Sequence, residues 1–316
     1  MPVAHVAYAP FLPQKDEAKG CVVLPLRQTV DFHPNLPSEE EQFATYCEVI
    51  ANSPDHNVTI RTLDIGGDKT IPYLGRTHQE ANPFMGWRSV RLSFEHPEFF
   101  ETQICAVLRA AAYADRLGGQ VKLMFPMITT LEEMRRVRSV VRKAGRKLGE
   151  ESKEFSEVPI GLMLEVPAAA VSIDLMLDVV DFVSIGSNDL VQYLMAADRD
   201  NPKVSHLCQP LSPPVLRVLS GVIKACRQAG KPITLCGEMA GQPRAFVLLL
   251  GMGLRQFSMS PAFVPATKQL AAKLSCEKAE QIFEQVLRLK TTANVKRFMS
   301  EQMSAIAPDL VILDTA

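Results

Sequence analysis

The chain has 316 residues, of which 47% are hydrophobic and 22% are charged, a balance typical of globular proteins and unlike that of disordered chains. Its 34 basic and 35 acidic side chains give a net charge of -1, so no overall field favours nucleic acid or an anionic membrane surface. The sequence contains no uninterrupted apolar run of the ~20 residues that a membrane helix needs. We therefore expect no nucleic-acid partner and no membrane partner.

The seven cysteines are odd in number and include no CxxC pair, so neither a disulfide framework nor a structural zinc site is indicated. Free thiols are typical of a reducing compartment, and the N-terminus lacks the pattern of a signal peptide. These features together predict a cytoplasmic protein.

Short apolar, β-branched runs alternate along the chain with longer segments in which apolar residues recur every three or four positions. The predicted strands lie at residues 21–26, 58–63, 87–91, 121–127, 160–166, 182–185, 233–236 and 256–259. The predicted helices cover residues 99–111, 131–141, 215–223 and 282–287, and a further helix is expected in the C-terminal tail.

Eight strands that alternate with helices over about 250 residues match the number and size of a (β/α)8 TIM barrel. The alternative α/β fold, a doubly wound open sheet, would carry a GxGxxG turn after its first strand, and the sequence has none. We therefore predict an α/β fold, a (β/α)8 barrel formed by one domain over residues 20–316. Residues 1–19 are expected to be poorly ordered.

Two acidic residues stand where predicted strands end, which is where such a barrel gathers its reactive groups. Glu165 closes an otherwise apolar strand, and Asp189 follows the next one. Two carboxylates, with water and substrate oxygens in the remaining positions, are a usual arrangement for Mg²⁺. The alternative, that both acids cap the N-termini of helices, stays open for Asp189 alone; for the pair we favour the metal.

Three arginines, Arg61, Arg88 and Arg199, lie at or near the same strand ends. A guanidinium group can bind phosphate or carboxylate through two parallel hydrogen bonds. The structural alternative for Arg61 is a buried ion pair with Asp64 or Asp68, and for Arg199 it is a surface salt bridge with its flanking aspartates.

Cys236 ends a predicted strand. Position alone favours an inert thiol, but beside a cation and a metal the thiol becomes a plausible acid/base group. The turn that contains Lys69 lacks the GxxxxGK[ST] spacing of a phosphate-binding loop, so we interpret Lys69 as a solvated side chain. No HExxH spacing supports zinc hydrolysis.

All of these residues except Arg199 belong to six segments that read RTLDIGGDK (61–69), NPFMGWRSVR (82–91), FPMI (125–128), GLMLEVPA (161–168), FVSIGSNDLVQY (182–193) and LCGEMAG (235–241). In this order the segments resemble the C-terminal domain of enzyme I, the phosphoenolpyruvate–protein phosphotransferase of bacterial sugar and nitrogen phosphotransferase systems. The resemblance extends from residue 37 to residue 289, and we interpret the chain as a member of the nitrogen-related branch. It implies a TIM-barrel domain that binds phosphoenolpyruvate.

The resemblance also implies roles for individual residues. Mg²⁺, or Mn²⁺ in its place, would be held by the carboxylates of Glu165 and Asp189. The phosphoenolpyruvate ligands would be Arg61, Arg88, Asn188, Asp189 and Arg199. Cys236 would be the catalytic acid that protonates the methylene carbon of the departing enolpyruvate. The implied partners are a phosphohistidine domain, an HPr-type carrier protein and a second copy of the chain in a homodimer.

Two features depart from the family pattern. The family's phosphorylated histidine lies in a separate N-terminal domain, and none of the six histidines here fits its setting, so the histidine is expected from a separate domain or chain. In the first strand, Arg27 falls about two residues nearer to Pro37 than the family's arginine, so we do not assign Arg27 as a ligand. A frameshifted or split gene is one hypothesis, which translation of the upstream DNA in three frames would test.

Two other functions stay open. A Mg²⁺-dependent lyase or aldolase acting on pyruvate-like substrates would use the same barrel, metal and carboxylate-binding arginines. A non-catalytic remnant that binds ligand or only dimerises would explain the altered first strand. Three arginines suited to phosphate, together with Cys236, favour phosphoryl transfer.

Overall fold

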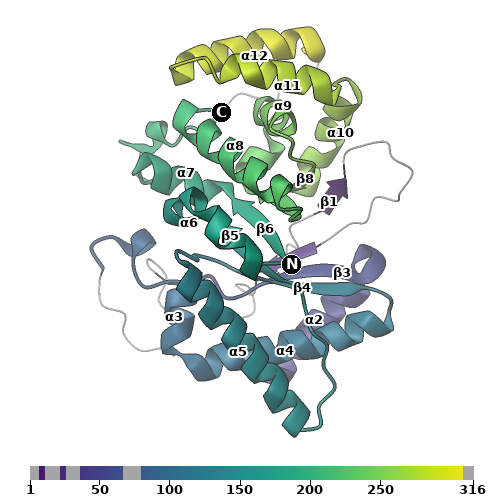
Figure 1. The fold of residues 1–316 in the computed structure, drawn as a ribbon. Coiled ribbons are helices and arrows are strands. Elements are labelled where there is room, and N and C mark those ends of the chain that lie inside the picture. The colour runs from purple at the N-terminus through teal and green to yellow at the C-terminus, as the bar shows by residue number, and fades with distance from the viewer. Residues whose placement is uncertain (1–6, 11–21, 26–35, 67–79, 309–316) are drawn as a thin grey trace. The chain divides into compact units, whose positions relative to one another are not determined.

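The computed structural model describes residues 7–10, 22–25, 36–66 and 80–308, in which strands alternate with helices (Figure 1). Contacts divide the chain into two compact units. Unit 1 contains Met1–His5, Lys19–Met163 and Val179–Asp181, and unit 2 contains Val6–Ala18, Leu164–Asp178 and Phe182–Ala316. The predicted α/β fold class is confirmed, whereas the single domain over residues 20–316 stays a prediction. Arg27, Asp68 and Lys69 lie outside the described residues.

Unit 1 is built on four parallel strands that neighbour one another in chain order. They are β2 (Val22–Pro25), β3 (Asn57–Arg61), β4 (Gln120–Phe125) and β5 (Ile160–Leu164). The middle three residues of β3 and all five residues of β5 are buried. Such near-continuous apolar runs are typical of parallel strands that are covered on both faces, and the four strands lie where the sequence predicted them.

The helices of unit 1 are α2 (Glu39–Ala51), α3 (Val90–Glu95), α4 (Pro97–Arg116) and α5 (Leu131–Glu150), with 3-10 turns η1 (Pro54–His56) and η3 (Pro83–Met85). Figure 1 shows α2, α4 and α5 close together beside β3 and β4, with which α2 and α4 are in contact. Capping boxes start α2 at Ser38 and α5 at Thr130, where each hydroxyl accepts the backbone N–H three residues on. The helices predicted at 99–111 and 131–141 are confirmed.

The strand predicted at residues 87–91 is wrong. Helix α3 begins at Val90, and the preceding stretch forms an isolated antiparallel bridge between Gly66 and Arg88. A run of five residues with two apolar positions does not distinguish a strand from the start of a helix. Ser89, with φ of 55°, turns the chain into α3.

In unit 2, strands β6 (Phe182–Gly186), β7 (Ile233–Cys236) and β8 (Gln256–Met259) are parallel and neighbour one another in that order. All three were predicted. A fourth strand, β1 (Ala7–Pro10), pairs antiparallel with β8, from Ala7 opposite Met259 to Pro10 opposite Gln256. β1 was not predicted, because its four residues include no β-branched side chain and end in proline.

Helices follow the strands of unit 2 after short connections: α7 (Ser187–Met195) begins directly after β6, and β7 is followed by the 3-10 turn η7 (Glu238–Gly241) and α9 (Pro243–Gly251). The other helices are α6 (Pro167–Val171), α8 (Pro213–Gln228), α10 (Val264–Ala272), α11 (Cys276–Val286) and α12 (Thr292–Ile306). Figure 1 shows α9, α11 and α12 packed together. The predicted helices at 215–223, at 282–287 and in the C-terminal tail are confirmed as α8, α11 and α12.

The remaining 3-10 turns are η4 (Ile173–Leu175), η5 (Leu177–Val179), η6 (Ser205–Leu207) and η8 (Pro261–Phe263). None of the helices in the described part of the chain combines the length and the hydropathy that crossing a bilayer requires.

Candidate functional site

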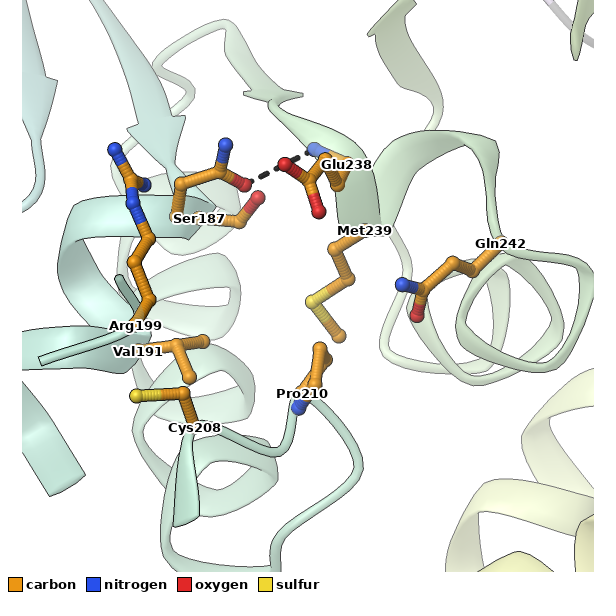
Figure 2. Close-up of a pocket in the computed structure, with 9 residues that line it drawn as sticks. Ser187, Val191, Arg199, Cys208, Pro210, Glu238, Met239 and Gln242 are labelled. Atoms are coloured by element: carbon orange, nitrogen blue, oxygen red, sulfur yellow. Dashed lines mark hydrogen bonds between the residues drawn. The ribbon is translucent and has the colours of Figure 1, made fainter. Parts of the chain in front are cut away.

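In unit 2, polar side chains from the ends of β6 and β7 line a cavity of about 90 Å³ (Figure 2). Figure 2 shows Arg199, Val191 and Cys208 on one side of the cavity and Met239 and Gln242 on the opposite side. Of the predicted site residues, Asn188 and Arg199 line this cavity. The full lining consists of Ser187, Asn188, Val191, Arg199, Cys208, Pro210, Glu238, Met239 and Gln242.

The Asn188 side chain is held in one orientation. Its Oδ1 accepts a hydrogen bond from the backbone N–H of Glu238 at 3.0 Å, drawn as the dashed line in Figure 2. Gly237, at φ of 101°, makes this approach possible, since a Cβ there would lie 2.8 Å from Asn188 Oδ1 and 2.5 Å from Ser187 Oγ. The side-chain carbonyl oxygen of Asn188 therefore accepts from η7, and the side-chain amide nitrogen is the group that can donate to a ligand.

Asp189 and Arg199 form an ion pair. Asp189 Oδ1 lies 3.4 Å from Arg199 Nη1, and the backbone N–H of Arg199 donates to Gln192 Oε1 at 3.1 Å. Asp189 is buried in the first turn of α7. The sequence suggested, as the alternative for Arg199, a salt bridge with its flanking aspartates. In the structure Arg199 pairs with Asp189, which is itself a predicted site residue.

Glu165, directly after β5, is 2% exposed, and Asp189 is 8% exposed. Both belong to unit 2. No group of three or more His, Cys, Asp or Glu that could hold a metal occurs among the residues that the structure describes. Carboxylate oxygens are ligands that Mg²⁺ takes, together with water and substrate oxygens, so the residue types at these two buried positions fit that ion.

Cys236, at the end of β7, lies in a polar network with β6. Its Sγ donates to the carbonyl of Ile185 at 3.3 Å, Ser184 Oγ donates to Sγ at 3.7 Å, and Ser187 Oγ donates to the Cys236 carbonyl at 2.7 Å. Cys226 offers a contrast, since burial within α8 raises the pKa of its thiol to about 12. Cys236 is half-buried and hydrogen-bonded, unlike a thiol that only fills a core.

Unit 1 brings Arg61 and Arg88 together around one carboxylate. Asp64 Oδ2 lies 3.3 Å from Arg61 Nη1, and Asp64 Oδ1 accepts from Arg88 Nη2 at 3.0 Å and from Ser89 Oγ. The Asp64 side chain is 9% exposed. The ion pair between Arg61 and Asp64 that the sequence analysis raised as an alternative is present, and its extension to Arg88 was missed.

The backbone around Arg88 is positioned by Gly66. The two residues form the isolated bridge, and Ser89 N–H donates to the carbonyl of Ile65 at 3.0 Å. At Gly66, with φ of 131°, a Cβ would lie 2.4 Å from the carbonyl oxygen of Trp87 and 2.6 Å from Arg88 Cα. A residue with a side chain cannot occupy this position without displacing Arg88.

The Asp64 cluster predicts an acid-dependent loss of stability. Burial alone would raise the pKa of Asp64, but Arg61, Arg88 and Ser89 outweigh it and lower that pKa to about 2. A carboxyl with a lowered folded-state pKa stabilises the fold above its unfolded pKa, here by about 2 kcal/mol, and loses that contribution as the pH falls from about 4 to 2. We expect Asp64→Asn to lack this pH-dependent part of the unfolding free energy.

Urea unfolding of both proteins at pH 6 and pH 3 measures the difference. The wild-type protein should lose about 1 kcal/mol more than Asp64→Asn over this range, because about half of the contribution is gone at pH 3. Equal losses would show that the two arginines do not hold Asp64 ionised.

Several cavity residues were not predicted. Val191 lies one helical turn after Ser187, so the 3.6-residue period of α7 could have found it. Cys208 and Pro210 lie in the connection between α7 and α8, and Gln242 precedes α9. The sequence carries no periodic signal for these three positions.

The family described as PEP-utilising enzyme, PEP-binding domain, matches residues 29–276. The chain is 43% identical over 306 residues to the phosphoenolpyruvate-protein phosphotransferase of Bacillus subtilis strain 168, covering 94% of this chain and 53% of the relative. It is 45% identical over 262 residues to the Listeria monocytogenes protein of the same name, covering 83% of this chain and 45% of the relative. The chain therefore spans about half the length of the curated relatives it matches.

A citrate lyase of known structure from Burkholderia xenovorans LB400 covers 93% of the chain, with a TM-score of 0.44 and 16% identity. Similarity at this level assigns neither a fold nor a function.

Proposed function

The chain belongs to the PEP-binding domain family of the PEP-utilising enzymes, and from this we propose that it is the phosphoenolpyruvate-binding part of a phosphotransferase. It would pass the phosphoryl group to a histidine of a separate domain or chain. The observation that carries the proposal is the grouping of the predicted ligands: Arg61 with Arg88 around Asp64 in unit 1, and Asn188 with Arg199 on the cavity of unit 2.

The proposed ligands match the chemistry of phosphoenolpyruvate, a small molecule with a phosphate and a carboxylate. Arg61, Arg88 and Arg199 supply planar guanidinium groups for these anions. The Asn188 amide nitrogen supplies a neutral donor whose orientation Glu238 N–H supports. Asp64 keeps two of the guanidinium groups in place, so little ordering is left to be done when substrate binds.

Glu165 and Asp189 are the residues that would hold Mg²⁺, or Mn²⁺ in its place. When bound, the ion supplies positive charge for the oxygens of the transferring phosphoryl group. Because the transition state of phosphoryl transfer is loose, the arginines contribute mainly by positioning the group and neutralising its charge. Cys236 is then the acid that protonates the enolpyruvate product.

The relatives' printed name, phosphoenolpyruvate-protein phosphotransferase, supports a protein as the phosphoryl acceptor. We propose a carrier protein of the HPr type as the next acceptor, and we extend the proposal to the nitrogen-related branch. A homodimer is also part of the proposal; the exposed apolar side chains of Val171 and Leu175 in unit 2 offer surface that a second copy could cover. The six described cysteines are free thiols, which supports a cytoplasmic location.

Incubation with radiolabelled phosphoenolpyruvate and Mg²⁺ tests the proposal that this chain binds the substrate while a separate domain or chain supplies the acceptor histidine. The chain alone is expected to form no phosphohistidine, and adding a separate phosphohistidine domain from a relative should produce acid-labile label on that domain. Transfer should be slow, because a histidine in trans lacks the roughly mM effective concentration that a short linker provides.

Two controls complete this experiment. A phosphohistidine domain whose acceptor histidine is replaced by alanine should take up no label. Acid-labile label on this chain itself would contradict the proposed dependence on a separate histidine.

A further inference from the structure

Ser184 lies in the middle of β6 and is 5% exposed. In the register of β6 and β7, Ser184 is opposite Thr234 and Gly186 is opposite Cys236. Side chains two positions apart on a strand share a face, so Ser184 and Cys236 lie on one face as diagonal neighbours. Gly186 has no side chain, so none stands opposite Cys236 on this face.

Two hydrogen bonds of opposite sense meet at Cys236 Sγ. The Ser184 hydroxyl donates to the sulfur at 3.7 Å, and the thiol donates to the carbonyl oxygen of Ile185 at 3.3 Å. The carbonyl can only accept, so it binds the thiol and not the thiolate. The hydroxyl can donate to either form, and a hydrogen bond to an ionised acceptor is roughly twice as strong as one to a neutral acceptor.

We propose that Ser184 is a positioning residue for the acid/base chemistry of Cys236, holding the sulfur in place and stabilising it when its proton leaves. This inference rests on the proposed role of Cys236 in the phosphotransferase reaction. Ser184 acts on the substrate only through the sulfur.

The proton moves from the sulfur of Cys236 to the carbon of the product. The S–H bond of Cys236 breaks, and the C=C π pair of the enolate form of enolpyruvate forms a C–H bond at the methylene carbon, which becomes the methyl group of pyruvate. A lone pair of the enolate oxygen forms the carbonyl C=O bond, so the negative charge passes from that oxygen to sulfur. The electron pair of the S–H bond stays on sulfur as a thiolate, and water later returns the proton. Because negative charge develops on sulfur during this step, the hydrogen bond from Ser184 strengthens in the transition state and lowers the barrier.

The same step in reverse gives an assay that uses this chain alone. A group that protonates enolpyruvate also removes a proton from pyruvate, so in D₂O with Mg²⁺ the methyl hydrogens of pyruvate exchange for deuterium, as ¹H NMR records. We expect Ser184→Ala to slow this exchange by about 10- to 100-fold, part of the effect that a positioned acid/base group provides. Pyruvate affinity, measured by calorimetry, should stay within about twofold, because Ser184 contacts the sulfur and not the ligand.

A second measurement does not depend on catalysis. Iodoacetamide reacts with the thiolate of a cysteine, and peptide mass spectrometry reads its rate at Cys236 separately from the other cysteines. At a fixed pH, Ser184→Ala should lower the alkylation rate at Cys236 by about tenfold, since one charge-assisted hydrogen bond to the thiolate is lost. Ser184→Thr, which returns a hydroxyl, should restore both alkylation and exchange.

Thr267→Val is the matched control. The buried Thr267 hydroxyl also donates to a sulfur in unit 2, that of Met259 at 3.4 Å, and to the carbonyl of Phe263. Its loss should lower the thermal midpoint, as the loss of Ser184 does, while leaving the alkylation of Cys236 and the pyruvate exchange unchanged.

The outcomes separate this inference from the proposed function. If Cys236→Ser loses the exchange and Ser184→Ala keeps both exchange and alkylation rates, the positioning role of Ser184 is wrong and the role of Cys236 stands. If Cys236→Ser keeps the exchange, the role of Cys236 is wrong. If the chain alone shows no exchange, the alkylation rate of Ser184→Ala decides the inference, and an unchanged rate overturns it.

Discussion

Replacing Glu165 by glutamine should abolish the Mg²⁺-dependent binding of phosphoenolpyruvate, with an affinity loss of about 100-fold or more, beyond what the loss of an outer-shell partner costs a metal site. Glutamine keeps the size of the side chain and removes its charge. Glu165 is almost fully buried after a strand whose residues are all buried, so water cannot take over the role of its carboxylate without repacking. Asp189→Asn should have a similar effect on the metal and should also release Arg199 from its ion pair.

Calorimetry with phosphoenolpyruvate in Mg²⁺ and in EDTA measures this dependence, and titration with Mn²⁺ alone gives a readout that needs no substrate. Glu101→Gln is a suitable control, because Glu101 is an acid of unit 1 that pairs with Lys143 and Lys147 and has no part in the proposed site. That variant should bind phosphoenolpyruvate with its metal dependence intact. Equally strong binding by the wild-type chain in Mg²⁺ and in EDTA would contradict the assignment of both acids.

The elements that the sequence predicted correctly are those with a strong repeating pattern. β5 and β6 are continuous apolar runs, and α8 repeats its apolar residues every three or four positions. The strand at 87–91 was predicted wrongly because five residues do not establish a period, and the conformation there is set by a turn at Ser89. β1 carries almost no signal of its own, since its conformation depends on pairing with β8, far along the chain.

The candidate site shows the same division. Strand ends located Glu165, which follows β5, Cys236, which ends β7, and Asp189, which lies three residues after β6, because the end of an apolar run can be read from the sequence directly. The contact of Arg88 with Asp64 joins residues that are 24 positions apart through a bridge at Gly66, and no local pattern encodes it. The contact of Ser184 with Cys236 depends on the register of two strands, which only the folded chain defines.

Cys236→Ser should separate phosphoryl transfer from proton transfer. The substitution keeps a side chain of similar shape that can still donate to the Ile185 carbonyl and accept from Ser184, but an alcohol is a far weaker acid than a thiol. In the assay with a separate phosphohistidine domain, pyruvate turnover is expected to fall by roughly 10²- to 10⁴-fold, the usual contribution of a positioned acid/base group. Phosphoenolpyruvate affinity should stay within about twofold, because the arginines and the two acids are unchanged.

A structural role for Cys236 makes the opposite prediction: a lowered thermal midpoint with unchanged turnover per folded molecule. Measuring both quantities on one preparation distinguishes the two, and Cys276→Ser supplies the matched control, since Cys276 is likewise a half-buried thiol of unit 2. Cys276→Ser should leave turnover unchanged whatever it does to the midpoint. If Cys236→Ser loses turnover while its thermal midpoint stays near that of the wild-type protein, neither packing nor substrate affinity has changed. The loss then comes from the acid/base chemistry of the sulfur.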